Sequence, residues 1–311
     1  MPLFNIANDN LKPIPQSSFK SEKQLQLMIE TNLLAAFNSR FIASEFRTGA
    51  QHAGRIDTLA LSEDNNPVII EYKTIESSDL INQSLFYLHW LADHRGDFEM
   101  AARKKLGNNI EIDWSDIRVI CIAPNYKRYD LHAVQVMGAN IELWRYRLFA
   151  NSSLYLEEIY RQALRSSPDA GEPEKNPVMV EAGKKARITA MTSSYTVEQH
   201  FVGKPDRICE VAQVIRDFVL SLDPAIQETP KKFYIAYKIS QNIVCMEIKK
   251  QRVALFLKLD PKSITKPPKN SRDVSEIGHY GTGDFELILE SVEDAAAAAQ
   301  FIGDAYRAIG G

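Results

Sequence analysis

The chain has 311 residues, which is enough for two domains with separate cores. Its 45% hydrophobic and 25% charged residues are typical of a globular protein and exclude a disordered or fibrous one. The formal net charge of −3 excludes a broadly basic protein, so contacts with nucleic acid must come from local basic patches.

The cysteines and the hydropathy pattern indicate where the protein resides. Cys121, Cys209 and Cys245 lie far apart in apolar contexts and form no CxxC pair, as expected of buried thiols in a reducing compartment. No apolar run approaches the roughly 18 residues of a membrane span, and the start of the chain lacks a basic-then-apolar signal. We therefore expect a soluble, cytoplasmic protein with no membrane segment.

The chain begins with an extended segment and a helix. Residues 1–18 are polar and contain prolines, which favours an extended arm or a short edge strand. Ser21 is a typical N-cap, and the apolar spacing after it predicts a helix to about Phe37. This helix carries two acids, Glu22 and Glu30, each of which is an ordinary solvated charge unless a reactive site lies nearby.

A short strand at Phe41–Phe46 leads into the glycine-bearing loop RTGAQHAG, Arg47–Gly54. The side chains of Arg47, His52 and Arg55 lie in or beside this loop. Such a loop next to a reactive site is suited to contact a phosphate backbone through arginine and main-chain N–H groups. A plain connection between strands is the equal alternative.

Two apolar, β-branched runs, Arg55–Leu61 and Pro67–Lys73, flank a polar loop at Ser62–Asn66. This pattern predicts a β-hairpin with a five-residue connection. If Leu61 and Pro67 are the last paired residues before the loop, they set the register of the whole hairpin. Each residue before Leu61 then pairs with the residue equally far after Pro67.

This register places Asp57 opposite Glu71 and Arg55 opposite Lys73, with all four side chains on one face. Two facing carboxylates repel each other, so their position amid Val and Ile favours a shared divalent cation. Hard oxygen ligands suit Mg²⁺, which completes its shell from water and phosphate. Lys73 can reach the same point to orient a water or a phosphate. The alternative is an ordinary hairpin with a solvated face.

A long helix is predicted from about Ser78 to Lys105, with Gln83 and Tyr87 one turn apart on the same face. A buried strand, a helix and an alternating strand follow at Ile117–Ala123, Asn125–Met137 and Ile141–Phe149. The order predicts an α/β fold, in which a mixed sheet is flanked by helices.

These motifs together resemble a known family. Asp57, followed after a short hairpin by Glu71-Tyr72-Lys73, resembles the PD-(D/E)XK nuclease superfamily, although Ile56 stands where the family name has proline. The segment from Gln83 to Tyr87 is similar to the QxxxY motif of the RecB-like branch, and the spacing from Asp57 to Glu71 resembles that of archaeal-type mismatch endonucleases. The resemblance covers roughly residues 20–150.

The resemblance implies a restriction-endonuclease-like fold and a Mg²⁺-dependent DNA endonuclease that hydrolyses phosphodiester bonds, with Mn²⁺ able to replace Mg²⁺. It leaves the pathway open among repair, restriction and phage defence. The implied metal ligands are Asp57, Glu71 and the carbonyl of Tyr72. A helix acid joins them; the distance to Asp57 favours Glu22, and Glu30 stays an alternative.

The remaining implied roles concern water, substrate and DNA. Lys73 would orient the attacking water, and Gln83 would hydrogen-bond near the metal or the scissile phosphate with support from Tyr87. The implied catalytic residues are therefore Glu22, Asp57, Glu71, Lys73 and Gln83. The candidate DNA contacts are Arg47, His52, Arg55 and Tyr87.

The composition changes after the nuclease-like domain, which we place at residues 1–165. Residues 166–194 are rich in proline and glycine and poor in large apolar residues, which indicates a linker. Residues 195–311 then predict a smaller α+β domain with helices at Asp206–Leu222 and Val292–Ile309. This part resembles a small domain of unknown function, sometimes labelled a predicted transport protein, that often follows nuclease-like domains.

Two alternatives stay open beside the endonuclease. The first is a non-catalytic nucleic-acid-binding or regulatory protein that retains the nuclease fold. The second treats the C-terminal domain as a module that binds a protein partner or a small ligand. DNA is the expected partner, and a homodimer is an open expectation because cutting both strands needs two sites.

Overall fold

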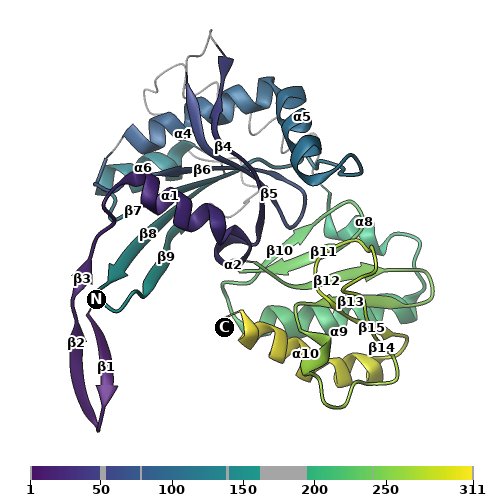
Figure 1. Cartoon of the computed structure of the whole chain (residues 1–311). Helices are drawn as coiled ribbons and strands as arrows, with labels where there is room; N and C mark the ends of the chain where they lie inside the picture. The colour runs from purple at the N-terminus through teal and green to yellow at the C-terminus, as the bar shows by residue number, and fades with distance from the viewer. Residues whose placement is uncertain are drawn as a thin grey trace. The chain divides into compact units, whose positions relative to one another are not determined.

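The computed structural model describes residues 2–49, 54–77, 79–137, 140–161, 195–239 and 241–309 (Figure 1). The chain divides into two compact units, Met1–Ser193 and Ser194–Gly311. The expected linker at 166–194 lies outside the described residues. No helix in the described ranges is both long and apolar enough to cross a membrane.

The first unit is built on a mixed sheet whose strand order is β3-β8-β7-β6-β5-β4, with β9 beside β8. Its strands are β3 (Gln16–Ser17), β4 (Ser39–Arg47), β5 (Arg55–Ser62), β6 (Pro67–Tyr72), β7 (Arg118–Ala123), β8 (Ile141–Phe149) and β9 (Leu154–Arg161). Strands β4, β5 and β6 are antiparallel, β6, β7 and β8 are parallel, and β9 is antiparallel to β8. The prediction of a mixed sheet is confirmed.

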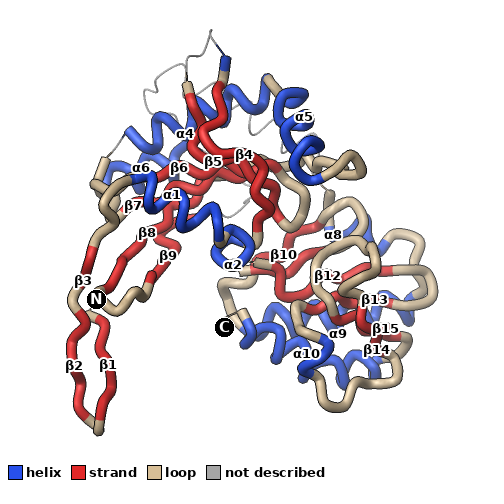
Figure 2. Tube along the Cα trace, in the orientation of Figure 1, coloured by secondary structure: helices blue, strands red, loops and turns tan. Residues whose placement is uncertain are grey.

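Helices cover both faces of this sheet (Figure 2). They are α1 (Glu22–Thr31), α2 (Leu33–Phe37), α4 (Asp79–Asp93), α5 (Arg95–Leu106) and α6 (Arg128–Met137). Helices α1 and α2 share one core with the sheet, whereas α4, α5 and α6 contribute to a separate core on the other face. All six residues of β6 are therefore buried, which is why its sequence is apolar on both sides.

The two long helices expected in this unit are each divided. Asn32 separates α1 from α2 and has non-helical backbone angles, φ −121° and ψ 25°. His94 separates α4 from α5 with φ −119° and ψ 45°. The His94 ring stacks on Trp90 at a centroid distance of 4.7 Å, and its Nδ1 lies 2.8 Å from the Trp90 carbonyl oxygen. These contacts of His94 with the preceding helical turn stabilise the break in a segment whose apolar spacing favours one helix.

The amino-terminal arm is more regular than the sequence predicted. Strands β1 (Leu3–Ala7) and β2 (Asn10–Ile14) form a two-stranded antiparallel sheet before β3. Asn8 and Asp9 at its turn have φ values of 50° and 60°, the positive pair that a two-residue hairpin turn requires. Strand β9, which follows β8, was not predicted.

The second unit is a six-stranded antiparallel sheet with helices on one face, and the predicted α+β class is confirmed. The strand order is β10-β11-β12-β13-β15-β14. The strands are β10 (Gln227–Pro230), β11 (Ile235–Lys238), β12 (Asn242–Ile248), β13 (Val253–Leu257), β14 (Ser271–Asp273) and β15 (Phe285–Leu289). The helices are α8 (Val197–Phe201), α9 (Asp206–Leu222), the 3₁₀ turn η1 (Pro261–Ser263) and α10 (Val292–Ala308).

A buried ion cluster joins β7, β8 and β9 in the first unit. The Glu142 carboxylate is 2.5 Å from Arg118 Nε and 3.3 Å from an Arg161 nitrogen, and it also accepts a hydrogen bond from Trp144 Nε1 at 2.9 Å. Burial opposes ionisation of Glu142, but the charges of Arg118 and Arg161 prevail and lower its pKa to about 2. The cluster therefore contains a buried carboxylate that stays charged.

Glu142→Gln should lower the free energy of unfolding of the first unit by about 3–5 kcal/mol, because it leaves two arginines without their buried counter-charge. Since the Glu142 pKa is lowered, its contribution is present above about pH 4.3, the ordinary glutamate value, and is lost as the pH falls toward 2. Urea unfolding followed by circular dichroism measures both effects. Glu157→Gln, which removes a partly exposed pair with Arg145, should cost at most about 1 kcal/mol. Equal losses in the two variants would contradict the assignment.

Candidate active site

The predicted register of the β5–β6 hairpin is confirmed for its four inner pairs, whereas the expected pairs Asp57–Glu71 and Arg55–Lys73 lie beyond the ladder. Leu61 pairs with Pro67, and the ladder continues to Thr58 opposite Ile70. It ends there, one pair before Asp57 and Glu71. The two strands therefore part at the point where the sequence placed the two acids opposite each other.

At this point side-chain oxygens accept the main-chain hydrogen bonds that the ladder no longer supplies. The Asp57 N–H donates to Glu71 Oε1 at 3.0 Å, and the Tyr72 N–H donates to Asp57 Oδ2 at 3.2 Å. Each acid thus accepts a main-chain hydrogen bond from the opposite strand. This reciprocal pair holds both carboxylates together between the strand ends.

Burial shapes the chemistry of both acids. Glu71 is fully buried, and burial followed by the charge of Asp57 raises its pKa well above the ordinary value. Burial also raises the pKa of Asp57, against the hydrogen bond from Tyr72 and the charge of Lys73, which lower it. Glu71 Oε2 is buried and has no hydrogen-bond partner among the described residues. An unsatisfied buried oxygen of this kind is costly, and a cation would remove that cost.

The donor set fits a hard divalent cation that takes few protein ligands. No group of three or more His, Cys, Asp and Glu side chains within the described ranges is arranged to hold a metal ion. Mg²⁺ needs only one or two carboxylates, because water and substrate phosphate supply its other ligands. Asp57 and the unsatisfied oxygen of Glu71 meet that requirement.

Lys73 and Glu22 lie beside this pair. Lys73 Nζ is 3.4 Å from Glu22 Oε2, and the Lys73 N–H donates to the Ile122 carbonyl at 2.9 Å. Both charges act on the Asp57 carboxyl group, since Lys73 lowers its pKa and Glu22 raises it. The lysine is therefore held by its main chain to β7 and by its ammonium group to α1.

The other helix acid has a different position. Glu30 Oε1 accepts hydrogen bonds from Thr58 Oγ1 at 2.7 Å and from Gln26 Nε2 at 2.9 Å. Thr58 Oγ1 also lies 3.1 Å from the Tyr72 hydroxyl. The Tyr72 side chain thus belongs to this internal network, and its carbonyl group is the part that can serve as a metal ligand. Of the two acids, Glu22 is the one that contacts Lys73.

Two further residues near the pair were missed by the sequence reasoning. Gln26 is 3% exposed, and its Nε2 donates to the Asp57 carbonyl at 2.7 Å, which fixes α1 against β5. Its signal was the polar i, i+4 pair that it forms with Glu30 in an otherwise apolar stretch. Glu45 adopts a left-handed φ of 55° within β4 and pairs with Lys23 at 2.9 Å and Arg55 at 2.6 Å. Nothing in the sequence indicates that conformation, which is uncommon for glutamate.

Gln83 and Tyr87 meet each other rather than the carboxylates. Gln83 Nε2 donates to the Tyr87 hydroxyl at 3.2 Å, and that hydroxyl accepts the Arg55 N–H at 3.1 Å. A Cβ at Gly54 would lie 2.7 Å from the Tyr87 ring, so glycine is required for this approach. Tyr87 is 5% exposed, which favours a supporting role at the start of β5 over direct contact with DNA.

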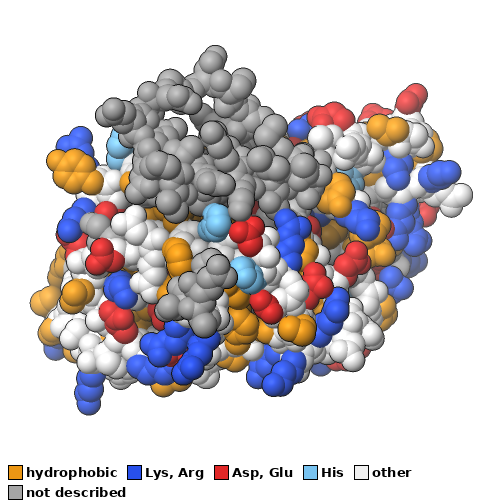
Figure 3. All heavy atoms as spheres, turned by 90° about the horizontal axis from the view of Figure 1, so that it is seen from above, with side chains coloured by type: hydrophobic (Ala, Val, Ile, Leu, Met, Phe, Trp, Pro, Cys, Tyr) orange, Lys and Arg blue, Asp and Glu red, His pale blue; other side chains and the backbone are white. Residues whose placement is uncertain are grey.

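The residues predicted to contact DNA differ in their exposure to solvent and in whether they already form an ion pair. Arg47 is exposed and lies opposite Arg55 in the β4–β5 ladder. The Arg55 side chain is also largely exposed, but its Nε pairs with Glu45. His52 lies outside the described residues. On the face seen in Figure 3, basic and acidic side chains are mixed over the described residues, in keeping with the small net charge.

Comparison with known proteins gives one full-length relative. Over 298 residues the chain is 30% identical to an uncharacterized protein of Haemophilus influenzae, covering 94% of this chain and 95% of the relative. The chain belongs to the same family as that protein. Residues 197–308 also match the family described as "Domain of unknown function (DUF5655)", which confirms the expectation of such a domain in the C-terminal part.

Two solved structures are similar to 42% of the chain. One is described as a repair endonuclease from Pyrococcus abyssi, with 17% identity and a TM-score of 0.24. The other is described as an EndoMS–dsDNA complex, with 17% identity and a TM-score of 0.26. The aligned part spans about half the length of each, 49% and 47%. At such low scores the likeness carries no functional inference, so we base the proposal below on the side chains of the site.

Glu71→Gln should flatten the pH dependence of stability. Because the pKa of Glu71 is raised in the folded protein, that state retains a proton that the unfolded chain releases above about pH 4.3. The free energy of unfolding of the metal-free wild type therefore falls as the pH rises from that value until the folded-state pKa is passed. Thermal unfolding between about pH 5 and 8 measures the slope.

The free energy of unfolding of Glu71→Gln should fall less steeply with pH than that of the wild type. The slope that remains in the variant comes from Asp57, whose pKa is also raised. Glu76→Gln, at an exposed acid of the same unit, is the matched control and should follow the wild type. Identical slopes in all three proteins would show that Glu71 retains no extra proton.

Proposed function

We propose that the first unit is a Mg²⁺-dependent DNA endonuclease that hydrolyses phosphodiester bonds. The observation that carries this proposal is the Asp57–Glu71 pair at the point where two strands part, in which Asp57 is partly buried and Glu71 fully buried. One oxygen of Glu71 has no hydrogen-bond partner among the described residues. A lysine, Lys73, lies two residues after Glu71. Two carboxylates can hold a divalent cation for phosphodiester hydrolysis, and a lysine beside them can stabilise the charge that develops.

Asp57 and Glu71 would hold the cation, with the carbonyl of Tyr72 as a further ligand. Bound Mg²⁺, or Mn²⁺ in its place, would supply Lewis-acid activation of the phosphate and of a water. The two protein carboxylates need no rearrangement for this task, because their reciprocal main-chain hydrogen bonds already fix them.

Lys73 would orient the attacking water or stabilise the negative charge that develops on the phosphate. Its ammonium group is mostly buried, and its contact with Glu22 at 3.4 Å holds it near Asp57. Glu22 is therefore proposed to position the lysine as well as to complete the acidic site.

Gln83 and Tyr87 are proposed to support the start of β5 through the Arg55 N–H group. DNA is the proposed substrate. Arg47 is an exposed cation close to this strand end and is the first candidate to contact its backbone.

A non-catalytic role is the second candidate, because the same hydrogen bonds also close the ends of two strands. A protein that retained the pair only for that purpose would bind nucleic acid without cleaving it. The assay below separates the two roles.

Asp57→Asn, Glu71→Gln and Lys73→Met should each strongly lower the rate of DNA cleavage in Mg²⁺ or Mn²⁺. Removing a residue that hydrogen-bonds to a metal ligand typically lowers activity roughly 10–100-fold. Because Asp57 and Glu71 are proposed as ligands themselves, their variants should lose more activity than that. For Lys73 we expect about 10²–10³-fold. The measurement is nicking of supercoiled, linear, single-stranded, branched and mismatched DNA, with the variants and the wild type compared at equal metal concentration.

Lys12→Met is the matched control for Lys73→Met, since it removes an exposed ammonium group from the separate β1–β2 sheet. It should cleave like the wild type. Mg²⁺ should also raise the unfolding temperature of the wild type more than that of Glu71→Gln. DNA binding without cleavage, unchanged in the three site variants, would contradict catalysis and favour the binding role.

A further inference from the structure

The sheet of the second unit has one face that helices do not cover. Helices α9 and α10 share a core with the side chains of Leu255, Leu287 and their neighbours. Because side chains alternate along a strand, Ala254 and Phe256 on β13 and Ile288 on β15 point to the opposite face, where they form a smaller cluster.

A loop covers part of this second face. His279 stacks on Phe256 at a centroid distance of 4.4 Å, and Val274 is buried in the same cluster. A Cβ at Gly281 would lie 2.6 Å from the Cys245 Cβ, so the loop backbone rests directly on the sheet at that point.

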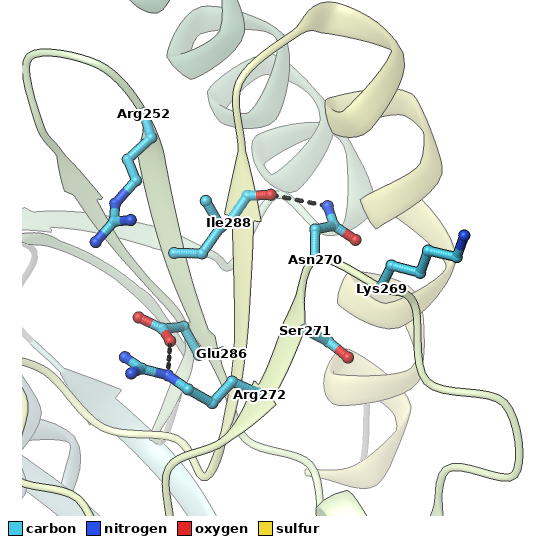
Figure 4. Close-up of a pocket in the computed structure, with 7 residues that line it drawn as sticks. All are labelled: Arg252, Lys269, Asn270, Ser271, Arg272, Glu286 and Ile288. Carbon is cyan, nitrogen blue, oxygen red and sulfur yellow. Dashed lines mark hydrogen bonds and ion pairs between the residues drawn. The ribbon is translucent and has the colours of Figure 1, made fainter.

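Beside the covered part lies a pocket of about 280 Å³ (Figure 4). Three strands and the residues next to them supply its lining, which is Arg252, Lys269, Asn270, Ser271, Arg272, Glu286 and Ile288. The strand register brings these lining residues together. Arg272 pairs with Glu286 across β14 and β15, and Ile288 pairs with Ala254 across β15 and β13. Arg252 precedes β13 on the same face as Ala254.

The two arginines of this pocket differ in their ion pairing. Arg272 Nε is 2.5 Å from a carboxylate oxygen of Glu286, which is 3% exposed. Arginine has five N–H donors, so this contact fixes the guanidinium plane and leaves its other donors available. Among the residues that the structure describes, none pairs with the Arg252 guanidinium group. Figure 4 shows both guanidinium groups on the same side of β15, with the Glu286 carboxylate against Arg272 and Ile288 nearer Arg252, while Lys269 extends away.

We propose that this pocket binds a phosphoryl group between Arg252 and Arg272. Guanidinium groups match the geometry of phosphate oxygens and bind them through two parallel hydrogen bonds. The volume of about 280 Å³ lies just below the roughly 300–1,000 Å³ of small-molecule sites, which suits a single phosphoryl group better than a whole cofactor. Ile288 provides an apolar surface on which the sugar of a nucleotide or of a nucleic-acid strand can rest. The site lies in the second unit and does not depend on the proposed nuclease chemistry.

Arg252→Ala in the full chain should weaken phosphate binding about tenfold or more, the loss expected for one charge-assisted hydrogen bond. Inorganic phosphate and adenosine monophosphate are titrated by calorimetry, and a short single-stranded oligonucleotide is titrated by fluorescence anisotropy. Lys250→Ala is the matched control, because it removes one positive charge from the same turn but does not line the pocket.

Glu286→Gln should change the phosphate affinity in the opposite direction. It removes the buried negative charge while its amide oxygen can still accept from Arg272, so phosphate affinity should rise. Arg272→Ala should weaken binding as Arg252→Ala does. Because it leaves Glu286 buried without its partner, its folding is checked by circular dichroism, and Arg252→Ala carries the test if it fails to fold.

The two probe types distinguish the source of the phosphate. Arg252-dependent binding of the monophosphate but not the oligonucleotide would assign a free nucleotide or phosphate ester, and the reverse would assign a nucleic-acid backbone. Either result supports the site. Absence of binding, or affinities that Arg252→Ala and Lys250→Ala lower equally, would overturn it.

Discussion

The candidate site depends on one constraint, which is that β5 and β6 part while their main-chain N–H groups still need partners. At the strand ends these partners are side chains: Glu71 accepts from Asp57, Asp57 accepts from Tyr72, and Tyr87 accepts from Arg55. Buried main-chain groups are rarely left unpaired. The acids are therefore held in place by the same hydrogen bonds that end the ladder, and one Glu71 oxygen has no partner among the residues that the structure describes.

The elements around this point serve the same arrangement. Parallel pairing of β6 with β7 gives the Lys73 N–H a carbonyl partner at Ile122 and so directs the lysine along the sheet. Helix α1 lies against β5 through Gln26, and this places Glu22 within reach of Lys73. Residues from four elements thus meet at one strand end, although each belongs to an ordinary helix or strand.

The local parts of the site were predictable from the sequence, and its tertiary parts were not. Apolar patterning and a polar five-residue loop fixed the hairpin register, so Asp57 and Glu71 could be placed together. Ser21 was predictable as an N-cap because its hydroxyl has a local partner in the Gln24 N–H. The left-handed Glu45 pairs with Lys23 and Arg55, which are distant in sequence, and periodicity does not report such contacts. The breaks at Asn32 and His94 occur within segments whose apolar spacing continues across them, so the same periodicity does not reveal them.

The pocket of the second unit lay beyond prediction for a similar reason. Arg252, Arg272 and Glu286 come from a turn and two strands that only the sheet order brings together. Strand β14 has three residues, too few for a periodic signal in the sequence.

The separate cores of the two units have a practical consequence for spectroscopy. The chain contains three tryptophans, Trp90, Trp114 and Trp144, and all of them lie in the first unit. Trp90 and Trp144 are buried in different cores on the two faces of the same sheet. Intrinsic tryptophan emission therefore reports the packing of the first unit alone, while the tyrosine-bearing second unit stays silent in that signal. Excitation at the red edge of indole absorption thus isolates the folding of one unit of the intact chain without any label.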